Sequence, residues 1–205
     1  MPSTGSKTGA FDGEPRYEFR IWAPSLAEVR ARLDGLSRHG PAEQTRETYI
    51  VSETTSDTNA KIRSGLMDIK VLLGAESGVE QWHPYLKTVF PIDASLIAQK
   101  IFPALHVEAP ALPGRVFTAE EFIDGVVKLH QRLAAVDLVK NRRRYAMGES
   151  AAEFVEIEIL GRKLESIAVE SASMRAVLGT VGKLAIGGQA NVSYVRQIKS
   201  MLARG

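Results

Sequence analysis

Charged and apolar side chains alternate along several stretches of this chain. In Arg16-Tyr17-Glu18-Phe19-Arg20 the three charged residues fall on one side of a strand, because successive side chains of a strand point to opposite faces. The other charged residues that share faces in this way are Lys61 with Arg63, Asp68 with Lys70, Lys140 with Arg142 and Arg144, and Glu156 with Glu158, followed by Glu170. Lysine and arginine bind phosphate oxygens, and carboxylates hold divalent cations or position water. The set therefore has the residue types that phosphate chemistry needs.

Two arrangements explain such alternation. In the first, an antiparallel sheet has one solvated face and one packed face, and the charges need no further purpose. In the second, the charged faces curl round a common interior, as in a barrel that encloses a ligand channel instead of a packed core. The pattern alone leaves both arrangements open.

The elements that must position these residues follow from periodicity and turn signals. Strands are predicted over residues 16–22, 47–52, 60–63, 66–73, 81–90, 137–147, 152–159 and 164–171, and helices over residues 25–36, 93–105, 118–133, 174–184 and 192–202. Pro84 makes the strand 81–90 an edge or bulged one. The order of strands, helices and strands again indicates an α+β fold with a largely antiparallel sheet. We expect a disordered tail over residues 1–14 and a single domain over residues 15–205.

Composition narrows the function classes. The 205 residues hold 26 basic and 24 acidic side chains, a net charge of +2, which is too balanced for a nucleic-acid coat. The chain lacks cysteine, and its four histidines are scattered, which argues against a thiolate or histidine zinc site. Because no apolar run is long enough to span a membrane and no signal peptide is evident, we expect a cytoplasmic protein.

The order of charged strands resembles the CYTH domain of the triphosphate tunnel metalloenzymes, from Arg16 to about Lys199. The first strand of that family reads Glu-x-Glu-x-Lys and is similar to residues 16–20, and its Arg-x-Arg and Thr-Ile-Lys strands look like Lys61-Ile62-Arg63 and Asp68-Ile69-Lys70. The family's later basic, acidic and Glu-x-Glu strands resemble residues 140–145, 153–158 and 164–170, and its terminal Ser-Tyr resembles Ser193-Tyr194.

The resemblance implies an eight-stranded antiparallel β-tunnel flanked by helices, which binds a triphosphate and uses Mg²⁺ or Mn²⁺. Carried over position by position, the phosphate-binding residues would be Arg16, Arg20, Lys61, Arg63, Lys70, Lys140, Arg142 and Arg144. The metal ligands would be Glu18, Glu156, Glu158 and Glu170, and the catalytic residues Glu18, Glu156 and Lys70. The reaction would be metal-assisted phosphoanhydride hydrolysis by a triphosphatase, in preference to adenylate cyclisation.

The sequence departs from the family pattern at three positions. Arg16 replaces the first glutamate of the signature, Arg20 replaces its lysine, and Ala168 replaces an acid of the late strand. Bases outnumber acids in the predicted interior, so a polyanion could be neutralised by fixed side chains with less need for metal. The alternative function is therefore a phosphate-binding or regulatory module without catalysis. The expected partner is a phosphate-rich small molecule; a nucleic-acid or membrane partner is not expected, and the oligomeric state is open.

Overall fold

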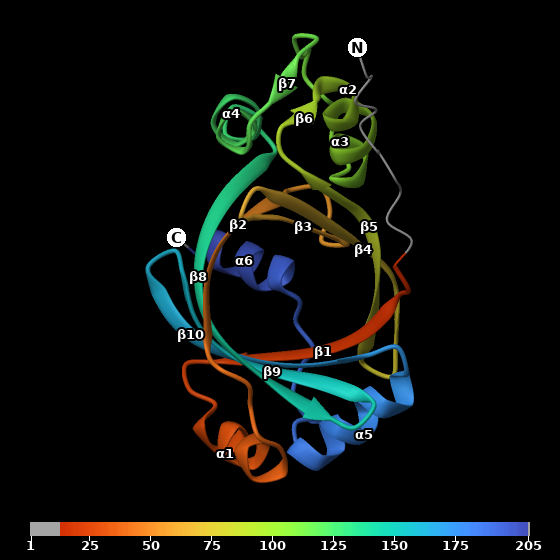
Figure 1. Ribbon diagram of the computed structural model, residues 1–205, viewed down its shortest axis with the longest axis vertical. Coiled ribbons are helices and arrows are strands. Elements are labelled where there is room, and N and C mark those ends of the chain that lie inside the picture. Colours follow the sequence, from red (N-terminus) through yellow and green to blue (C-terminus); the bar gives the residue numbers. More distant parts are fainter. Residues whose placement is uncertain (1–12, 205) are drawn as a thin grey trace, which may run out of the picture.

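Eight antiparallel strands close into a barrel. The structure is a computed structural model that describes residues 13–204 (Figure 1). Round the barrel the strands lie in the order β1-β10-β9-β8-β2-β3-β4-β5. They are β1 (Arg16–Ala23), β2 (Glu43–Ser52), β3 (Thr58–Arg63), β4 (Leu66–Glu76), β5 (Val79–Val89), β8 (Leu133–Met147), β9 (Ser150–Ile159) and β10 (Arg162–Ser171). The predicted α+β fold with an eight-stranded antiparallel tunnel is confirmed.

Two helical layers cover the outside of the barrel (Figure 1). Helices α1 (Ala27–Leu36) and α5 (Met174–Leu184) pack on β1, β9 and β10, where Phe154 and Val169 are buried. On the opposite side lies the segment between β5 and β8, which packs on Ile62 and Ile69. Its elements are β6 (Ile92–Asp93), α2 (Ala94–Leu96), η1 (Ile97–Ile101), α3 (Phe102–Ala104), β7 (Val116–Phe117), α4 (Ala119–Phe122) and η2 (Ile123–Val127).

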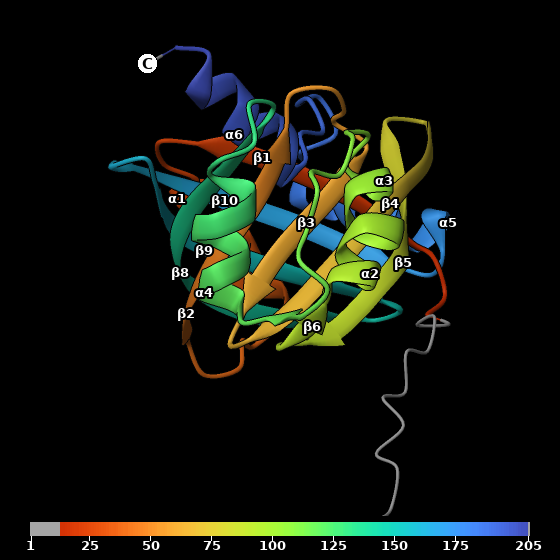
Figure 2. The ribbon, with the colours of Figure 1, turned by 90° about the horizontal axis from the view of Figure 1, so that it is seen from above.

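The last helix, α6 (Tyr194–Leu202), lies across one end of the barrel. It falls within the outline of the strands in Figure 1 and at one edge of the molecule in Figure 2. Among the described residues, none of the helices combines the length and apolarity that crossing a membrane requires.

Three local predictions can be compared with the structure. The helix predicted over residues 118–133 ends at Val127, because Leu129 is exposed and Leu133 already belongs to β8. Pro84 faces Lys70 at a shift in the register of β4 and β5, so β5 is bulged as expected. Most of the predicted tail, residues 1–12, lies outside the described residues, and the domain division stays a prediction.

Candidate functional site

The interior of the barrel holds a charged cavity of about 340 Å³. Seven basic and five acidic side chains line it: Arg20, Lys61, Arg63, Lys70, Lys140, Arg142, Arg144, Glu18, Glu47, Asp68, Glu153 and Glu170. They come from β1, β2, β3, β4, β8, β9 and β10, so almost every strand of the barrel contributes. Of the two arrangements open to the sequence, the charged faces curl round a common interior.

Helix α6 covers one part of the same interior faces. Val136 and Leu138 precede Lys140 on its face of β8, and Val155 and Ile157 follow Glu153 on its face of β9. All four pack in one cluster with Val195, Ile198 and Met201 of α6. The interior is therefore apolar beneath α6 and charged beyond it, because α6 supplies apolar partners to only one stretch of each strand.

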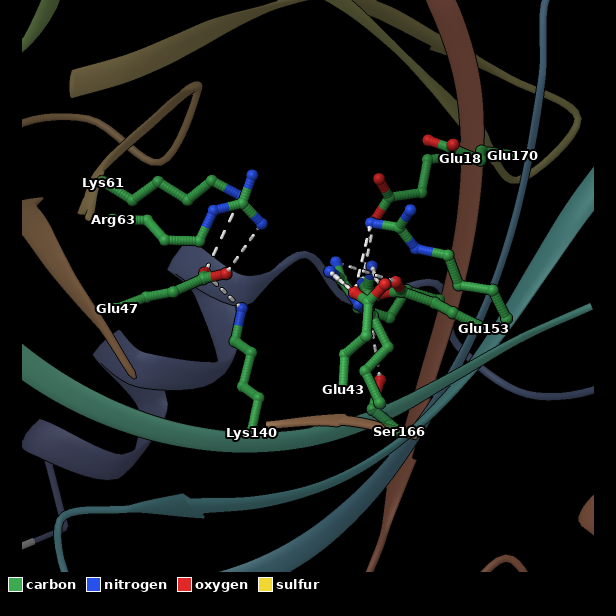
Figure 3. Close-up of polar contacts among 12 residues, drawn as sticks. Glu18, Glu43, Glu47, Lys61, Arg63, Lys140, Glu153, Ser166 and Glu170 are labelled. Atoms are coloured by element: carbon green, nitrogen blue, oxygen red, sulfur yellow. Dashed lines mark hydrogen bonds and ion pairs between the residues drawn. The ribbon is translucent and has the colours of Figure 1, made fainter. Parts of the chain in front are cut away.

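Within the charged cavity, one group of side chains centres on a carboxylate. We call Glu47, Lys61, Arg63 and Lys140 the Glu47 cluster (Figure 3). The side chain of Glu47 is 1% exposed. Its Oε2 lies 2.6 Å from Lys140 Nζ and 3.7 Å from Lys61 Nζ, and its Oε1 lies 3.6 Å from Arg63 Nη1. A single buried carboxylate thus faces three cations.

A second group centres on a guanidinium. We call Arg20, Glu18, Glu153 and Ser166 the Arg20 cluster. Arg20 Nε donates to Glu18 Oε1 at 2.8 Å, Nη2 donates to Glu153 Oε1 at 2.9 Å, and Nη1 donates to Ser166 Oγ at 3.1 Å. One buried cation here faces two carboxylates, the reverse of the Glu47 cluster.

The pKa values follow this distribution of charge. Burial acts to raise the pKa of Glu153, but Arg20, Lys140 and Arg142 outweigh it and hold that pKa at about 2. The pKa of Glu18 is lowered too, because Arg20 and Lys70 outweigh its burial. Burial has the opposite effect on the amine of Lys140: despite its contact with Glu47, the pKa of Lys140 falls to about 7, and the positive charge of Lys61 contributes to the fall.

The aromatic ring of Tyr194 contacts both clusters. The Arg20 guanidinium lies 4.4 Å from the centroid of this ring, and Lys140 Nζ lies 3.8 Å from it, so both cations gain a cation–π contact. Tyr194 is the first residue of α6, and Ser193 caps this helix by accepting a hydrogen bond from the backbone N–H of Arg196. The helix that covers the barrel end thereby also places a ring in the charged cavity.

Most of the residues singled out from the sequence come together in this cavity. The structure brings together Glu18, Arg20, Lys61, Arg63, Lys70, Lys140, Arg142, Arg144 and Glu170. Arg16 is outside the lining: its side chain is 46% exposed and lies 3.9 Å from Glu170. Lys70 lines the cavity without an ion pair to any residue in the range 13–204, although its charge lowers the pKa of Glu18.

Glu156 and Glu158 do not lie in the cavity. Along β9 the residues that face the interior are Glu153, Val155 and Ile157, so the even-numbered acids point outward. Glu156 accepts a hydrogen bond from Asn141 and lies 3.8 Å from Arg143, and Glu158 is exposed. The expected inward orientation of these two residues is corrected. It failed because Val155 and Ile157 pack against α6 inside the barrel and not against an outer helix.

Two central residues, Glu47 and Glu153, were not selected from the sequence. Both faces of β9 carry buried apolar residues, with Phe154 beneath the outer helices and Val155 beneath α6, so alternation does not identify the inner face. The sequence did hold a signal for Glu47: Glu47, Tyr49 and Val51 are every second residue of β2, so the acid shares a face with two residues that could be buried. Tyr49 accompanies the acid by accepting a hydrogen bond from Lys140 Nζ at 3.0 Å.

Comparisons with known proteins agree on the architecture. No family model matches the sequence. A search of curated proteins also finds no match. Among solved structures, a candidate adenylyl cyclase from Hippeastrum is similar over 91% of this chain and 96% of its own, with 14% identity and a TM-score of 0.51. A candidate adenylate cyclase from Bacillus halodurans is similar over 92% and 98% of the two chains, with 11% identity and a TM-score of 0.50. The chain has a CYTH-like fold. Identities this low establish the fold alone.

The acids of this CYTH-like tunnel do not fit a resident divalent cation as they stand. Within residues 13–204, no three aspartate, glutamate or histidine side chains gather into a group that could hold a metal. Of the four ligands expected from the sequence, Glu156 and Glu158 lie outside the tunnel and Glu18 is bound to Arg20. Glu170 remains in the lining but lies beside Arg16 at the edge of the cavity. The carboxylates of the tunnel neutralise basic side chains.

Proposed function

We propose that the CYTH-like tunnel binds a phosphate-rich small molecule, a triphosphate or another organic phosphate. The observation that carries this proposal is the Glu47 cluster, in which Lys61, Arg63 and Lys140 share one carboxylate. Because the cations outnumber the acid, this wall of the cavity keeps a net positive charge that a polyanion would neutralise. Phosphate oxygens are strong acceptors for lysine and arginine, and arginine can bind them through two parallel hydrogen bonds.

The exposure of the three cations indicates which of them meet the ligand. The side chains of Arg63 and Lys61 are 33% and 20% exposed, so both can reach an anion in the cavity without leaving Glu47. Lys140 is buried behind them between Tyr49 and Tyr194 and would act mainly through its charge. Lys70, Arg142 and Arg144 line the same space and would bind the remaining phosphate oxygens.

Binding without catalysis is the form of this function that the geometry supports best. The similar protein from Hippeastrum is described as having a dominant triphosphatase activity, which favours a phosphoanhydride as the ligand. Hydrolysis assisted by Mg²⁺ or Mn²⁺ would need free carboxylate oxygens, and one oxygen of Glu18 and one oxygen of Glu153 already accept hydrogen bonds from Arg20. The catalytic roles of Glu18 and Lys70 therefore stay predictions, and we assign none to Glu156, which lies outside the tunnel.

Calorimetric titration with inorganic tripolyphosphate tests the proposal. We expect saturable binding by the unmodified protein and, for Arg63→Met, an affinity lower by about tenfold or more, because a charge-assisted hydrogen bond to phosphate is lost. Arg175→Met is the matched control, since Arg175 is an exposed residue of α5 on the outside of the barrel. This control should bind tripolyphosphate as the unmodified protein does.

Two results would contradict this function. Absence of binding in the presence and in the absence of Mn²⁺ would leave the charged cavity without the proposed ligand, as would equal losses in the two variants. Steady turnover of tripolyphosphate at roughly 1 s⁻¹ or faster, the ordinary range of enzymes, would show instead that the tunnel is catalytic.

A further inference from the structure

The oxygens around Arg20 are of the kind that a divalent cation binds. Glu18 on β1, Glu153 on β9 and Ser166 on β10 each direct one side-chain oxygen at the guanidinium, at 2.8, 2.9 and 3.1 Å. Mg²⁺ and Mn²⁺ prefer carboxylate oxygens, and Mg²⁺ is often held by only one or two carboxylates together with substrate phosphates. Without Arg20, the half-buried carboxylates of Glu18 and Glu153, on strands separated only by β10, would lose the cation that lies between them, and Arg142 would remain 3.8 Å from Glu153.

We propose that the Arg20 guanidinium takes the place of a divalent cation in this tunnel and makes anion binding independent of metal. Arg20 is held at its stem by β1 and at its three nitrogens by oxygens of three strands, and its side chain is 5% exposed. A guanidinium in this position cannot be removed by a chelator or exchanged with solvent. It also brings no bound water, so it supplies positive charge without the activated nucleophile that a metal can provide.

Neighbouring contacts support a permanent position for this cation. The ring of Tyr194 covers the guanidinium at 4.4 Å, and the backbone N–H of Arg20 donates to Asn191 Oδ1 at 2.8 Å. Burial disfavours the charged guanidinium, but Glu18, Tyr194 and Glu153 outweigh it and raise the pKa of Arg20 well above its ordinary value. An arginine stays charged throughout the ordinary pH range, and these contacts hold its charge in place.

Titration with Mn²⁺ alone tests the substitution directly, without any phosphate ligand. We expect no saturable Mn²⁺ binding by the unmodified protein. In Arg20→Met the two carboxylates lose their cation, so Mn²⁺ should bind there and raise the melting temperature by about 5 °C or more at a hundredfold excess over its dissociation constant. Arg63→Met is the matched control: it removes a tunnel cation but leaves Arg20 between Glu18 and Glu153, and should gain no Mn²⁺ affinity.

Several outcomes would overturn the inference. Mn²⁺ binding by the unmodified protein that Glu18→Gln abolishes would show a working metal site beside Arg20. A folded Arg20→Met protein that gains no Mn²⁺ affinity would show that Arg20 does not occupy a cation position. If Arg20→Met does not fold, tripolyphosphate binding by the unmodified protein decides: equal affinity in EDTA and in Mn²⁺ supports the inference, and a requirement for Mn²⁺ overturns it.

The last arm of this test rests on the proposed function, but the two can fail separately. If tripolyphosphate does not bind in either buffer while Arg20→Met acquires a Mn²⁺ site, the phosphate ligand is wrong and the role of Arg20 stands. If tripolyphosphate binds only with Mn²⁺, the phosphate ligand stands and the role of Arg20 is wrong.

Discussion

The Glu47 and Arg20 clusters line one cavity, but the charged group at the centre of each has the opposite sign. In the Glu47 cluster a carboxylate is the centre and three cations surround it. In the Arg20 cluster a guanidinium is the centre, and two carboxylates and a hydroxyl surround it. The two clusters therefore differ in net charge: three cations share one carboxylate in the first, whereas in the second the two carboxylates are balanced by Arg20 and by Arg142, which lies 3.8 Å from Glu153.

This difference shows that a count of charged residues does not locate a ligand. Arg20 and Lys61 are both bases of the cavity lining, but Arg20 makes short hydrogen bonds within the protein. Lys61 makes only longer ion pairs, at 3.7 Å to Glu47, which it shares with two other cations, and at 4.0 Å to Asp68. Burying ions costs solvation energy, which is recovered only when each has well-placed partners. The Arg20 cluster meets that requirement internally. On the proposed function, the Glu47 cluster would meet it fully once an anion binds.

The largest effect should come from removing the central carboxylate. We expect Glu47→Gln to lower the free energy of unfolding by about 3 kcal/mol or more, because the buried Lys140 and the half-buried Arg63 lose their ion-pair partner and Lys61 keeps only Asp68 at 4.0 Å. Chemical denaturation measures the loss. Tripolyphosphate should restore part of the stability by neutralising the same three cations.

Glu43→Gln is the matched control for this variant. Glu43 pairs with Arg142 at 2.8 Å, but its side chain is half exposed, so its loss should cost much less stability than the loss of Glu47. If both variants lost the same stability, the excess of cations in the Glu47 cluster would not set it apart from the other ion pairs of the tunnel.

A smaller effect should appear as pH passes through the pKa of Lys140. Since this pKa is lowered to about 7 in the folded protein, Lys140 loses its proton near neutrality and the Glu47 cluster loses one positive charge. We therefore expect affinity for tripolyphosphate to fall between pH 6 and pH 8. Stability should change in the other direction: between about pH 7 and the ordinary lysine pKa the unfolded chain binds more protons, so stability rises with pH.

Comparison with Lys140→Met isolates this contribution from the titration of the ligand itself. The groups that face Lys140 are Glu47, Lys61, Glu153 and the rings of Tyr49 and Tyr194, and all of them are retained in the variant. Its affinity should be lower at pH 6 and should vary less with pH. Parallel pH profiles for the two proteins would assign the titration to another group.

The sequence predicted the barrel better than it predicted the centres of charge. Alternation in β1, β3 and β4 marked the inner faces because their outward residues, such as Phe19, Ile62 and Ile69, pack beneath the outer elements. Together with the turn signals, this determined strand order along the chain and the α+β class. The helix over residues 118–133 was predicted too long, because local periodicity does not reveal that the helical segment ends at Val127 and that β8 begins at Leu133.

The pairing of charges could not be predicted, because it depends on neighbours far apart in the chain. Arg20 and Glu153 are 133 positions apart, and Glu47 and Lys140 are 93 positions apart. Nor does the sequence state that α6 enters one end of the barrel and makes part of its interior apolar. Because α6 packs there, the inner face of β9 is the opposite of the one expected from the sequence: Glu153 points inward, and Glu156 and Glu158 point outward.

The smallest effect should come from the outward acids of β9. We expect the double variant Glu156→Gln/Glu158→Gln to change stability by no more than about 1 kcal/mol and to leave affinity for tripolyphosphate unchanged, because exposed charge pairs contribute little. Glu153→Gln makes the same chemical change on the opposite face of the same strand. It removes a half-buried partner of the buried Arg20 and should cost about 3 kcal/mol or more.

Denaturation and calorimetry on these two proteins would decide which face of β9 forms the tunnel wall. A changed phosphate affinity in the double variant, with Glu153→Gln unaffected, would mean that Glu156 and Glu158 point inward. The Arg20 cluster would then lose one of its carboxylates, and the contrast between an anion-accepting wall and an internally neutralised wall would fail. The opposite result would tie that contrast to the position of α6, since the packing of Val155 and Ile157 on this helix is what turns Glu153 toward Arg20.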